Sequence, residues 1–296
     1  MRRFLFKCAA FLLLLLGSYA VLFALVVGLH RRALEHCRVG DAVHAVMLGD
    51  SHAMWAIDDA QIPGLRNISL NAEGYRYTYA KLSYLLQHEP HIERIYLTVG
   101  PHNFSGYFDE YITGDSFKFF VHRYLSVMDA SDYVTLMQVN LRGFPELLKK
   151  VVAVGFMPGV RGKCELYGAF PDDHERKVFD PESARRRLDS QFFLDGRVIG
   201  ESVSNVTYLE RIVTLCRERG VRLTIVSTPM HERYVQGVPA HYKQRLADFI
   251  ANHNLEYYHF AGLDLPDSAY LPDGDHLNYD GAMRATAEFG RYHGNR

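Results

Sequence analysis

The pattern of apolar and polar positions separates an apolar N-terminal run from a later series of short alternating elements. Residues 9–29 carry no charged side chain, and 21 such residues are enough to span the hydrocarbon core of a bilayer as a helix. The next residues, 30–42, are mostly polar. The pattern therefore predicts a membrane anchor at 1–29, a connector at 30–42 and one folded domain at 43–296.

Two other interpretations of the apolar run stay open. A signal peptide could be cleaved at the small-residue site Ser18-Tyr19-Ala20, although nine further apolar or glycine residues follow it and the usual apolar region is shorter. A buried core helix would need a polar face, which the run lacks. Three basic side chains before the run and two after it, together with the α-amino group, favour a cytoplasmic N-terminus and a folded domain outside the cytoplasm.

Beyond residue 43, strand-like and helix-like runs alternate. Strands are expected at 43–48, 66–70, 95–99, 221–227 and 255–260. Helices are expected at 75–87, 206–219, 240–253 and 277–292. Strand, helix and strand at this spacing indicate parallel βαβ units with right-handed crossovers. The sequence therefore predicts a flavodoxin-like three-layer α/β/α domain with a five-stranded parallel sheet.

This alternation is interrupted between about residues 104 and 204. The stretch begins with many aromatic residues, contains a segment broken by glycine and proline at 155–159, and carries a charged run at 182–187. We expect a mostly helical insertion over the carboxyl edge of the sheet, where it could build a substrate pocket. Extra core for a larger domain is the alternative, and composition does not separate the two.

A polar motif follows the first expected strand. Gly49 and Asp50 end the apolar run and leave Ser51 at its carboxyl end, which is the ligand-binding edge of an open α/β sheet. A serine there is a candidate nucleophile if a base can reach it. Near the other end of the chain, Asp273 and His276 stand three residues apart before the last expected helix. His276 is the proposed base, and Asp273 could hold its other ring nitrogen.

The acidic residues near His276 have a simpler interpretation that stays open. Asp273, Gly274 and Asp275 are residue types that suit a turn and a helix N-cap. Asp275 is also a rival for the carboxylate role, but as the immediate neighbour of His276 it is expected to point elsewhere.

A serine early in the chain, with Asp and His three apart late in it, is the layout of the GDSL/SGNH hydrolases and acyltransferases. The chain resembles this family over residues 43–103 and 205–292. The resemblance implies an SGNH-hydrolase-like fold and serine-dependent chemistry on acyl esters. It also implies three oxyanion donors: the serine N–H, a glycine N–H after the second strand and an asparagine side chain after the third. Asn103 stands in the asparagine's place.

The second and third sequence blocks depart from the family pattern. Ala72 occupies the register of the glycine, and Gly74 follows two residues late; a backbone N–H could serve from either. The block Gly-x-Asn-Asp reads Gly100-Pro101-His102-Asn103-Phe104, so Asn103 could instead cap a turn. These departures keep open a second class of function. In it, a catalytically silent SGNH-like domain is a scaffold or glycan-binding partner of a membrane acyltransferase or polymer-export complex.

Four further residues are pocket candidates because they follow strand ends. They are His52, Trp55, His102 and His231. Each could equally be an ordinary loop or core residue. The 15 histidines are scattered and include no helical pair flanking a glutamate, so no metal and no cofactor are expected.

Charge and cysteine content limit the remaining classes. The net charge of -1 gives no support to nucleic-acid binding, which requires a basic face. Cys8 lies in the apolar N-terminus, which leaves Cys37, Cys164 and Cys216 for the folded part. An odd number argues against a disulfide framework, while one bridge among the three stays open.

The resemblance and the anchor together imply a class of substrate. Anchored extracytoplasmic members of the family commonly act on acyl groups of cell-surface polysaccharides or wall polymers. We therefore expect an acylated saccharide or polymer as substrate, at the periplasmic or cell-surface side of the membrane. A membrane acyltransferase partner is compatible with transfer, and the choice between hydrolysis and transfer stays open.

Overall fold

The computed structural model describes residues 1–112, 114, 121–124, 126–128, 130–139, 149, 160–161, 164–172 and 174–296. The chain forms two compact units, each considered by itself. The first comprises Met1–Arg38 with Thr113–Leu166, and the second comprises Val39–Ile112 with Tyr167–Arg296. All the candidate site residues lie in the second unit.

The second unit is built on a sheet of five parallel strands, as predicted. Its order is β2 (Leu65–Asn67), β1 (Ala45–Leu48), β3 (Arg94–Thr98), β6 (Arg222–Val226) and β7 (Glu256–Tyr258). Counted along the chain, this is the order 2-1-3-4-5 of flavodoxin-like folds, whose ligands bind at the carboxyl edge between the first and third strands. The topology therefore assigns the ligand edge to the ends of β1 and β3.

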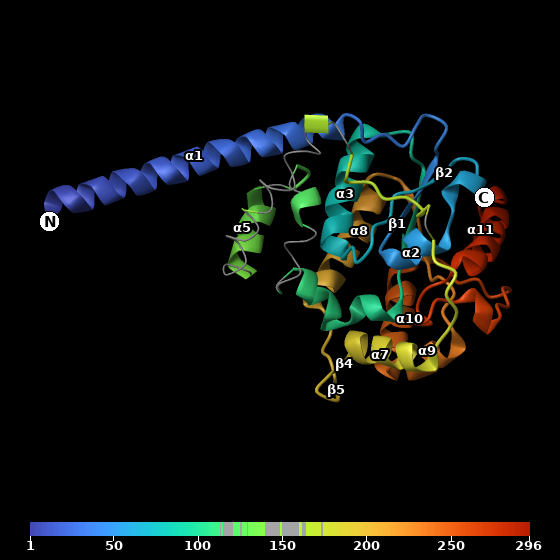
Figure 1. The fold of residues 1–296 in the computed structure, drawn as a ribbon. Helices are drawn as coiled ribbons and strands as arrows, with labels where there is room; N and C mark the ends of the chain where they lie inside the picture. Colours follow the sequence, from blue (N-terminus) through green and yellow to red (C-terminus); the bar gives the residue numbers. More distant parts are fainter. Residues whose placement is uncertain are drawn as a thin grey trace. The chain divides into compact units, whose positions relative to one another are not determined.

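Helices cover both faces of this sheet (Figure 1). On one face lie α3 (Tyr75–His88), α8 (Val203–Glu218) and α10 (Ala240–His253). On the other lie α2 (Ser51–Ala56) and α11 (Tyr279–Gly294). Successive side chains of a strand point to opposite faces, so Val46 and Leu48 join the first core while Ala45 and Met47 join the second. Burial on both faces explains why β1 is apolar throughout.

Most expected elements lie within a few residues of their observed positions. The second strand is shorter than expected because its regular pairing ends at Asn67. The Ile68 N–H still donates to the Met47 carbonyl, and the Leu70 N–H to the Gly49 carbonyl. The chain therefore stays beside β1 up to the level of Gly49, which brings the loop after β2 to the ligand edge.

The first unit contains α1 (Arg2–Leu34), which includes the whole apolar run. Among the described residues, α1 is the one helix long and apolar enough to cross a membrane, and only 6% of its most apolar stretch is buried. The helix continues into the expected connector, ending after Arg31 and Arg32, whose charges suit a helix C-terminus. Just beyond it, Cys37 forms a disulfide with Cys164 of the same unit.

The expected insertion at about 104–204 is divided between the two units. Its described elements include η3 (Gly106–Tyr111), η4 (Val121–Arg123), α5 (Ala130–Val139), α7 (Pro181–Phe192) and the hairpin of β4 (Phe193–Leu194) with β5 (Arg197–Val198). The segment at 155–159 lies outside the described residues. The charged run at 182–187 belongs to α7, which the second unit contains.

Candidate active site

Ser51 lies where β1 passes into α2. Gly49 precedes this turn with φ 138°, and a Cβ built on it would lie 1.8 Å from Thr98 Oγ1. Only glycine therefore fits between β1 and β3 at this point. Asp50 caps α2 by accepting a hydrogen bond from the His52 N–H, and Ser51 is the first helical residue. The tight turn exposes the serine at the ligand edge.

The structure brings Ser51 together with both distant partners expected from the sequence. Ser51 Oγ lies 2.7 Å from His276 Nε2, and His276 Nδ1 lies 2.7 Å from Asp273 Oδ2. A carboxylate can only accept, so Nδ1–H donates to Asp273 and Nε2 is left to accept the serine O–H. This is the tautomer that a general base for Ser51 requires.

Asp273 shapes the turn as well as orienting the histidine. Its Oδ1 accepts the N–H groups of Asp275 and His276, both at 3.1 Å. The turn-forming and catalytic interpretations of Asp273 are therefore compatible, because different carboxylate oxygens serve each. Burial raises the pKa of Asp273, but the hydrogen bond and charge of His276 outweigh it and bring the pKa below its usual value.

Ser51 and His276 open into a cavity of about 450 Å³. Four aromatic side chains line it: Trp55, Tyr107, Phe108 and Tyr111. Its polar lining includes Asn71, Glu175, Ser183 and Arg187. A pocket with aromatic walls and a few polar groups has the general character of a small-molecule site.

Two backbone N–H groups at the cavity are candidate donors to an oxyanion. Ser51 and Ala72 both line the cavity. Within the part of the chain that the structure describes, neither of their N–H groups donates to a protein acceptor. Ala72 has φ 54°, an uncommon left-handed conformation for a residue with a side chain. Gly74, the other expected donor, is the N-cap of α3 and does not line the cavity.

Asn103 follows β3 as expected, but its amide faces Asp50. Its Nδ2 donates to Asp50 Oδ2 at 2.9 Å, and its Oδ1 accepts the Gly100 N–H at 2.8 Å. The side chain is buried and does not line the Ser51 cavity. The structure therefore brings Asn103 to Asp50 rather than to the expected oxyanion position. The physical reason is that a buried carboxylate requires donors.

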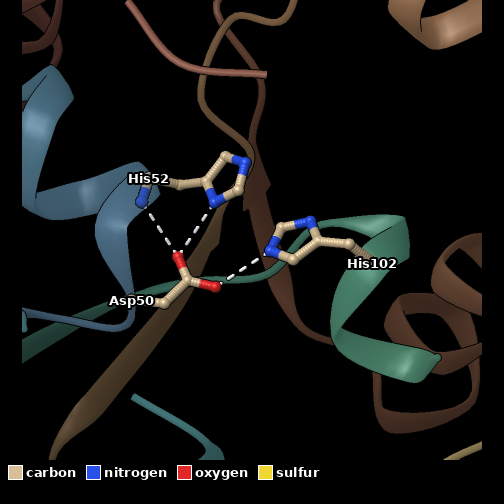
Figure 2. A group of neighbouring side chains, drawn as sticks. All are labelled: Asp50, His52 and His102. Carbon is tan, nitrogen blue, oxygen red and sulfur yellow. Dashed lines mark hydrogen bonds and ion pairs between the residues drawn. The ribbon is translucent and has the colours of Figure 1, made fainter. Parts of the chain in front are cut away.

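Asp50 is the centre of a buried polar cluster (Figure 2). Its Oδ1 accepts the His52 N–H and Nδ1 at 3.0 Å, and its Oδ2 accepts His102 Nε2 and Asn103 Nδ2 at 2.9 Å. Burial alone would raise the pKa of Asp50, but the charges and hydrogen bonds of His52 and His102 hold it well below its usual value. Asp50 is therefore a stable buried anion.

His52 connects this cluster to the loop that carries His276. Its Nε2 lies 2.8 Å from Asp275 Oδ1, while Asp275 Oδ2 accepts Arg187 Nε at 2.8 Å and Gln191 Nε2 at 3.0 Å. Burial lowers the pKa of His52, but the carboxylates of Asp275 and Asp50 outweigh it and raise the pKa to about 10. As expected, Asp275 is not the hydrogen-bond partner of His276: its Oδ2 lies 4.0 Å from His276 Nδ1, beyond hydrogen-bond range.

Two sets of side chains have metal-binding residue types at close range. They are Asp50, His52 and His102, and His52, Asp275 and His276. Four N–H donors already occupy the oxygens of Asp50, and His52, Arg187 and Gln191 bind those of Asp275. Hydrogen bonding therefore accounts for the arrangement of both sets.

The other pocket candidates differ in their placement. Trp55, His52 and His102 line the cavity, and Trp55 Nε1 donates to Asn71 Oδ1 at 2.7 Å. His231 does not line it; its ring stacks on Phe179, with centroids 3.6 Å apart.

Arg187 was not among the site residues expected from the sequence, because the charged run at 182–187 was considered only as a whole. Ala184 and Gln191 of α7 are buried at spacings of three and four residues from Arg187. That helical spacing was the signal that Arg187 lies on the inward face of α7.

Fold and site have the layout that the sequence resemblance implies. A flavodoxin-like sheet carries a serine after its first strand and Asp-x-x-His before its last helix. No family model matches the chain, and no curated protein sequence matches it.

Several solved structures are similar in fold. One is described as a candidate platelet activating factor from Streptococcus pneumonia, with a TM-score of 0.42 and 13% identity over 96% of this chain and 98% of that one. A GDSL-like lipase from Bacteroides thetaiotaomicron has a TM-score of 0.40 and 9% identity over 91% and 99% of the two chains. A candidate acylhydrolase from Bacteroides fragilis has a TM-score of 0.39 and 9% identity over 91% and 98%.

Proposed function

We propose that the protein is a serine-dependent acyl-ester hydrolase or acyltransferase. The observation that carries the proposal is the continuous hydrogen-bonded path from Ser51 through His276 to Asp273 at the edge of an open cavity. His276 Nε2 takes the serine proton as Ser51 Oγ attacks the ester carbonyl. The Ser51 and Ala72 N–H groups stabilise the resulting oxyanion. His276 then returns the proton to the departing alcohol, leaving an acyl-serine.

The second half of the reaction releases the acyl group. His276 removes a proton from water or from an acceptor hydroxyl, whose oxygen attacks the acyl-serine carbonyl. Collapse of the intermediate breaks the bond to Ser51 Oγ, which regains its proton from His276. Water as the acceptor yields a free acid, and a sugar hydroxyl yields an acylated sugar. The same residues serve both outcomes.

The cavity lining supports an acylated carbohydrate as the substrate. The aromatic rings of Trp55, Tyr107 and Tyr111 provide flat apolar surfaces of the kind that pack against sugar rings. Asn71 and Arg187 add polar groups near them. The Trp55 indole N–H can only donate, so the Asn71 amide oxygen faces it and the amide NH2 is directed elsewhere.

We infer that α1 anchors the protein and that its folded part lies outside the cytoplasm, at the periplasmic or cell-surface side. The length and exposure of α1 support the anchor. The Cys37–Cys164 disulfide supports the location because such bonds persist in oxidising compartments. A membrane-held enzyme would meet surface polymers at high local concentration.

Labelling of the full-length protein with a fluorophosphonate tests the proposal. We expect a covalent adduct at Ser51, found by peptide mass spectrometry, and no adduct in the Ser51→Ala variant. Absence of labelling in the native protein would instead favour a silent SGNH-like scaffold or glycan-binding partner of a membrane acyltransferase or polymer-export complex. The displacement of Asn103 from the cavity is the observation that favours this second function.

A second experiment distinguishes transfer from hydrolysis. The full-length protein is incubated with an activated acyl ester, with and without candidate oligosaccharides. Acylated sugar that increases with the oligosaccharide concentration would support transfer. Free acid alone, unaffected by any sugar, would support hydrolysis.

A further inference from the structure

The buried contacts behind the catalytic residues form a second connection between the two loops that meet at the active site. Asp50 directly precedes Ser51, and Asp275 directly precedes His276. The His52 ring lies between these carboxylates, with Nδ1 3.0 Å from Asp50 Oδ1 and Nε2 2.8 Å from Asp275 Oδ1. This three-residue bridge therefore accompanies the direct contact between Ser51 and His276.

The geometry determines the charge of His52. Each ring nitrogen faces a carboxylate oxygen, and ionised carboxylates only accept hydrogen bonds. Both nitrogens must therefore carry a proton, which makes the ring a cation. All three members are almost completely buried, at 3%, 5% and 0% exposure for Asp50, His52 and Asp275. Loss of the cation would leave two carboxylates without their shared partner in a dry environment, which is costly.

The surroundings hold the bridge rigidly. Asp50 is further held by His102 and Asn103, and Asp275 by Arg187 and Gln191. The His52 ring stacks on His102 at 4.0 Å between centroids and lies 4.7 Å from the His276 ring. The bridge therefore restrains both the start of α2 and the plane against which the His276 imidazole rests.

We propose that His52 is a positioning residue whose cation, held between Asp50 and Asp275, keeps Ser51 and His276 in the alignment that catalysis requires. This inference depends on the proposed esterase chemistry for its kinetic consequence. His52 lines the cavity, but carboxylates engage both of its ring nitrogens, so it acts on Ser51 and His276 through Asp50 and Asp275. Displacement of a catalytic pair by about 1 Å can cost about 100-fold in rate.

The kinetic test compares variants of the full-length protein. His52→Ala is expected to lower kcat and the rate of fluorophosphonate labelling by about 100-fold, with KM changed by less than about threefold. Imidazole added to this variant should enter the vacated space beside the cavity and restore labelling at least tenfold. The matched control is Tyr96→Phe, which removes a partly buried hydrogen bond between Tyr96 of β3 and His293 of α11, away from the site. It should label at the native rate.

A spectroscopic readout separates this inference from the proposed function. With ¹⁵N-labelled histidine, the His52 signals, assigned by their loss in His52→Ala, should show a proton on both ring nitrogens at pH 8. One unprotonated nitrogen would overturn the inference whether or not the protein is an enzyme. Labelling of His52→Ala at the native rate would also overturn it while leaving the esterase proposal intact. Failure of the native protein to label would overturn the proposed function and the kinetic role of His52 alike.

Discussion

At the scale of single residues, the site depends on the hydrogen-bond partner of each buried polar atom. Asp273 and Asp275 stand two positions apart and have different functions in the structure. Asp273 bonds the His276 ring at 2.7 Å, while Asp275 is turned toward His52 and Arg187. Ordinary hydrogen-bonding capacity accounts for this division, because each buried carboxylate must find donors.

The hydrogen-bonded path from Ser51 through His276 to Asp273 predicts that substitutions along it lower activity by unequal amounts. Ser51→Ala and His276→Ala should each lower kcat by about 10⁴-fold or more, since each removes an atom that reacts. Asp273→Asn should retain more activity, because Ser51 and His276 remain in contact. Ester hydrolysis by the purified full-length variants is the measurement, with thermal unfolding as the control for folding. Equal activity in native protein and Ser51→Ala would contradict the catalytic role.

The charge of His52 predicts how stability depends on pH. Folding raises its pKa from 6.5 to about 10, so its contribution is complete below pH 6.5 and is lost as the pH rises toward 10. The apparent melting temperature of the native protein should therefore fall between pH 6.5 and 9.5. In His52→Gln this fall should be smaller. Parallel curves for the two proteins would show that another group is responsible.

At the scale of elements, the site is made by the ends of strands and the start of helices. The ends of β1 and β3 supply Ser51 and His102, the loop after β2 supplies Ala72, and the loop before α11 supplies His276. The helix α7 adds Arg187 from a distant part of the chain. The carboxyl ends of parallel strands lie at one edge of the sheet. Residues far apart in the sequence can therefore meet in one site.

Close packing between β1 and β3 predicts the effect of Gly49→Ala. The new Cβ would lie 1.8 Å from Thr98 Oγ1, at a backbone φ of 138° that alanine rarely adopts. We expect a loss of about 2–4 kcal/mol in the free energy of unfolding. Gly262→Ala is the matched control, since no atom lies within 4 Å of its added Cβ. Thermal unfolding of both variants compares them, and equal stability would contradict the packing argument.

At the scale of the whole molecule, the chain consists of two compact units: one contains the apolar helix α1, and the other contains the parallel sheet and the candidate active site. The first unit contains both α1 and the Cys37–Cys164 bridge, so the bridge joins the end of the helix to residues of the insertion. The second unit has the complete sheet and cavity. The apolar helix and the oxidised cysteine pair are the two features that support the proposed location outside the cytoplasm.

If α1 is a membrane anchor, it should remain uncleaved on the mature protein. Mass spectrometry of the mature chain should find residues 1–20, and reporter fusions after residue 40 should be active only outside the cytoplasm. A mature chain beginning at Val21 would show a cleaved signal peptide instead.

The disulfide predicts how the cysteines react. Maleimide labelling should reach Cys37 and Cys164 only after reduction, and their reaction without a reductant would contradict the disulfide.

The sequence by itself determined the elements and their order. Apolar periodicity located the strands and helices, because an element that is buried on one or two faces has apolar residues at a regular spacing along the sequence. Two short motifs likewise singled out Ser51, Asp273 and His276 as candidates, because the residue types that can act as nucleophile, base and orienting acid are few. The alternation of buried strands and helices also sufficed for the five-stranded parallel sheet.

Only the tertiary structure decided which groups meet. It directed Asn103 to Asp50, turned Asp275 toward His52, and brought Arg187 to the cavity from a charged run. It also chose Cys164 as the partner of Cys37. Such pairings depend on distances between segments far apart in the chain and on the demand that every buried charge find a partner. Neither condition leaves a periodic pattern, so no local reading of the sequence could have determined them.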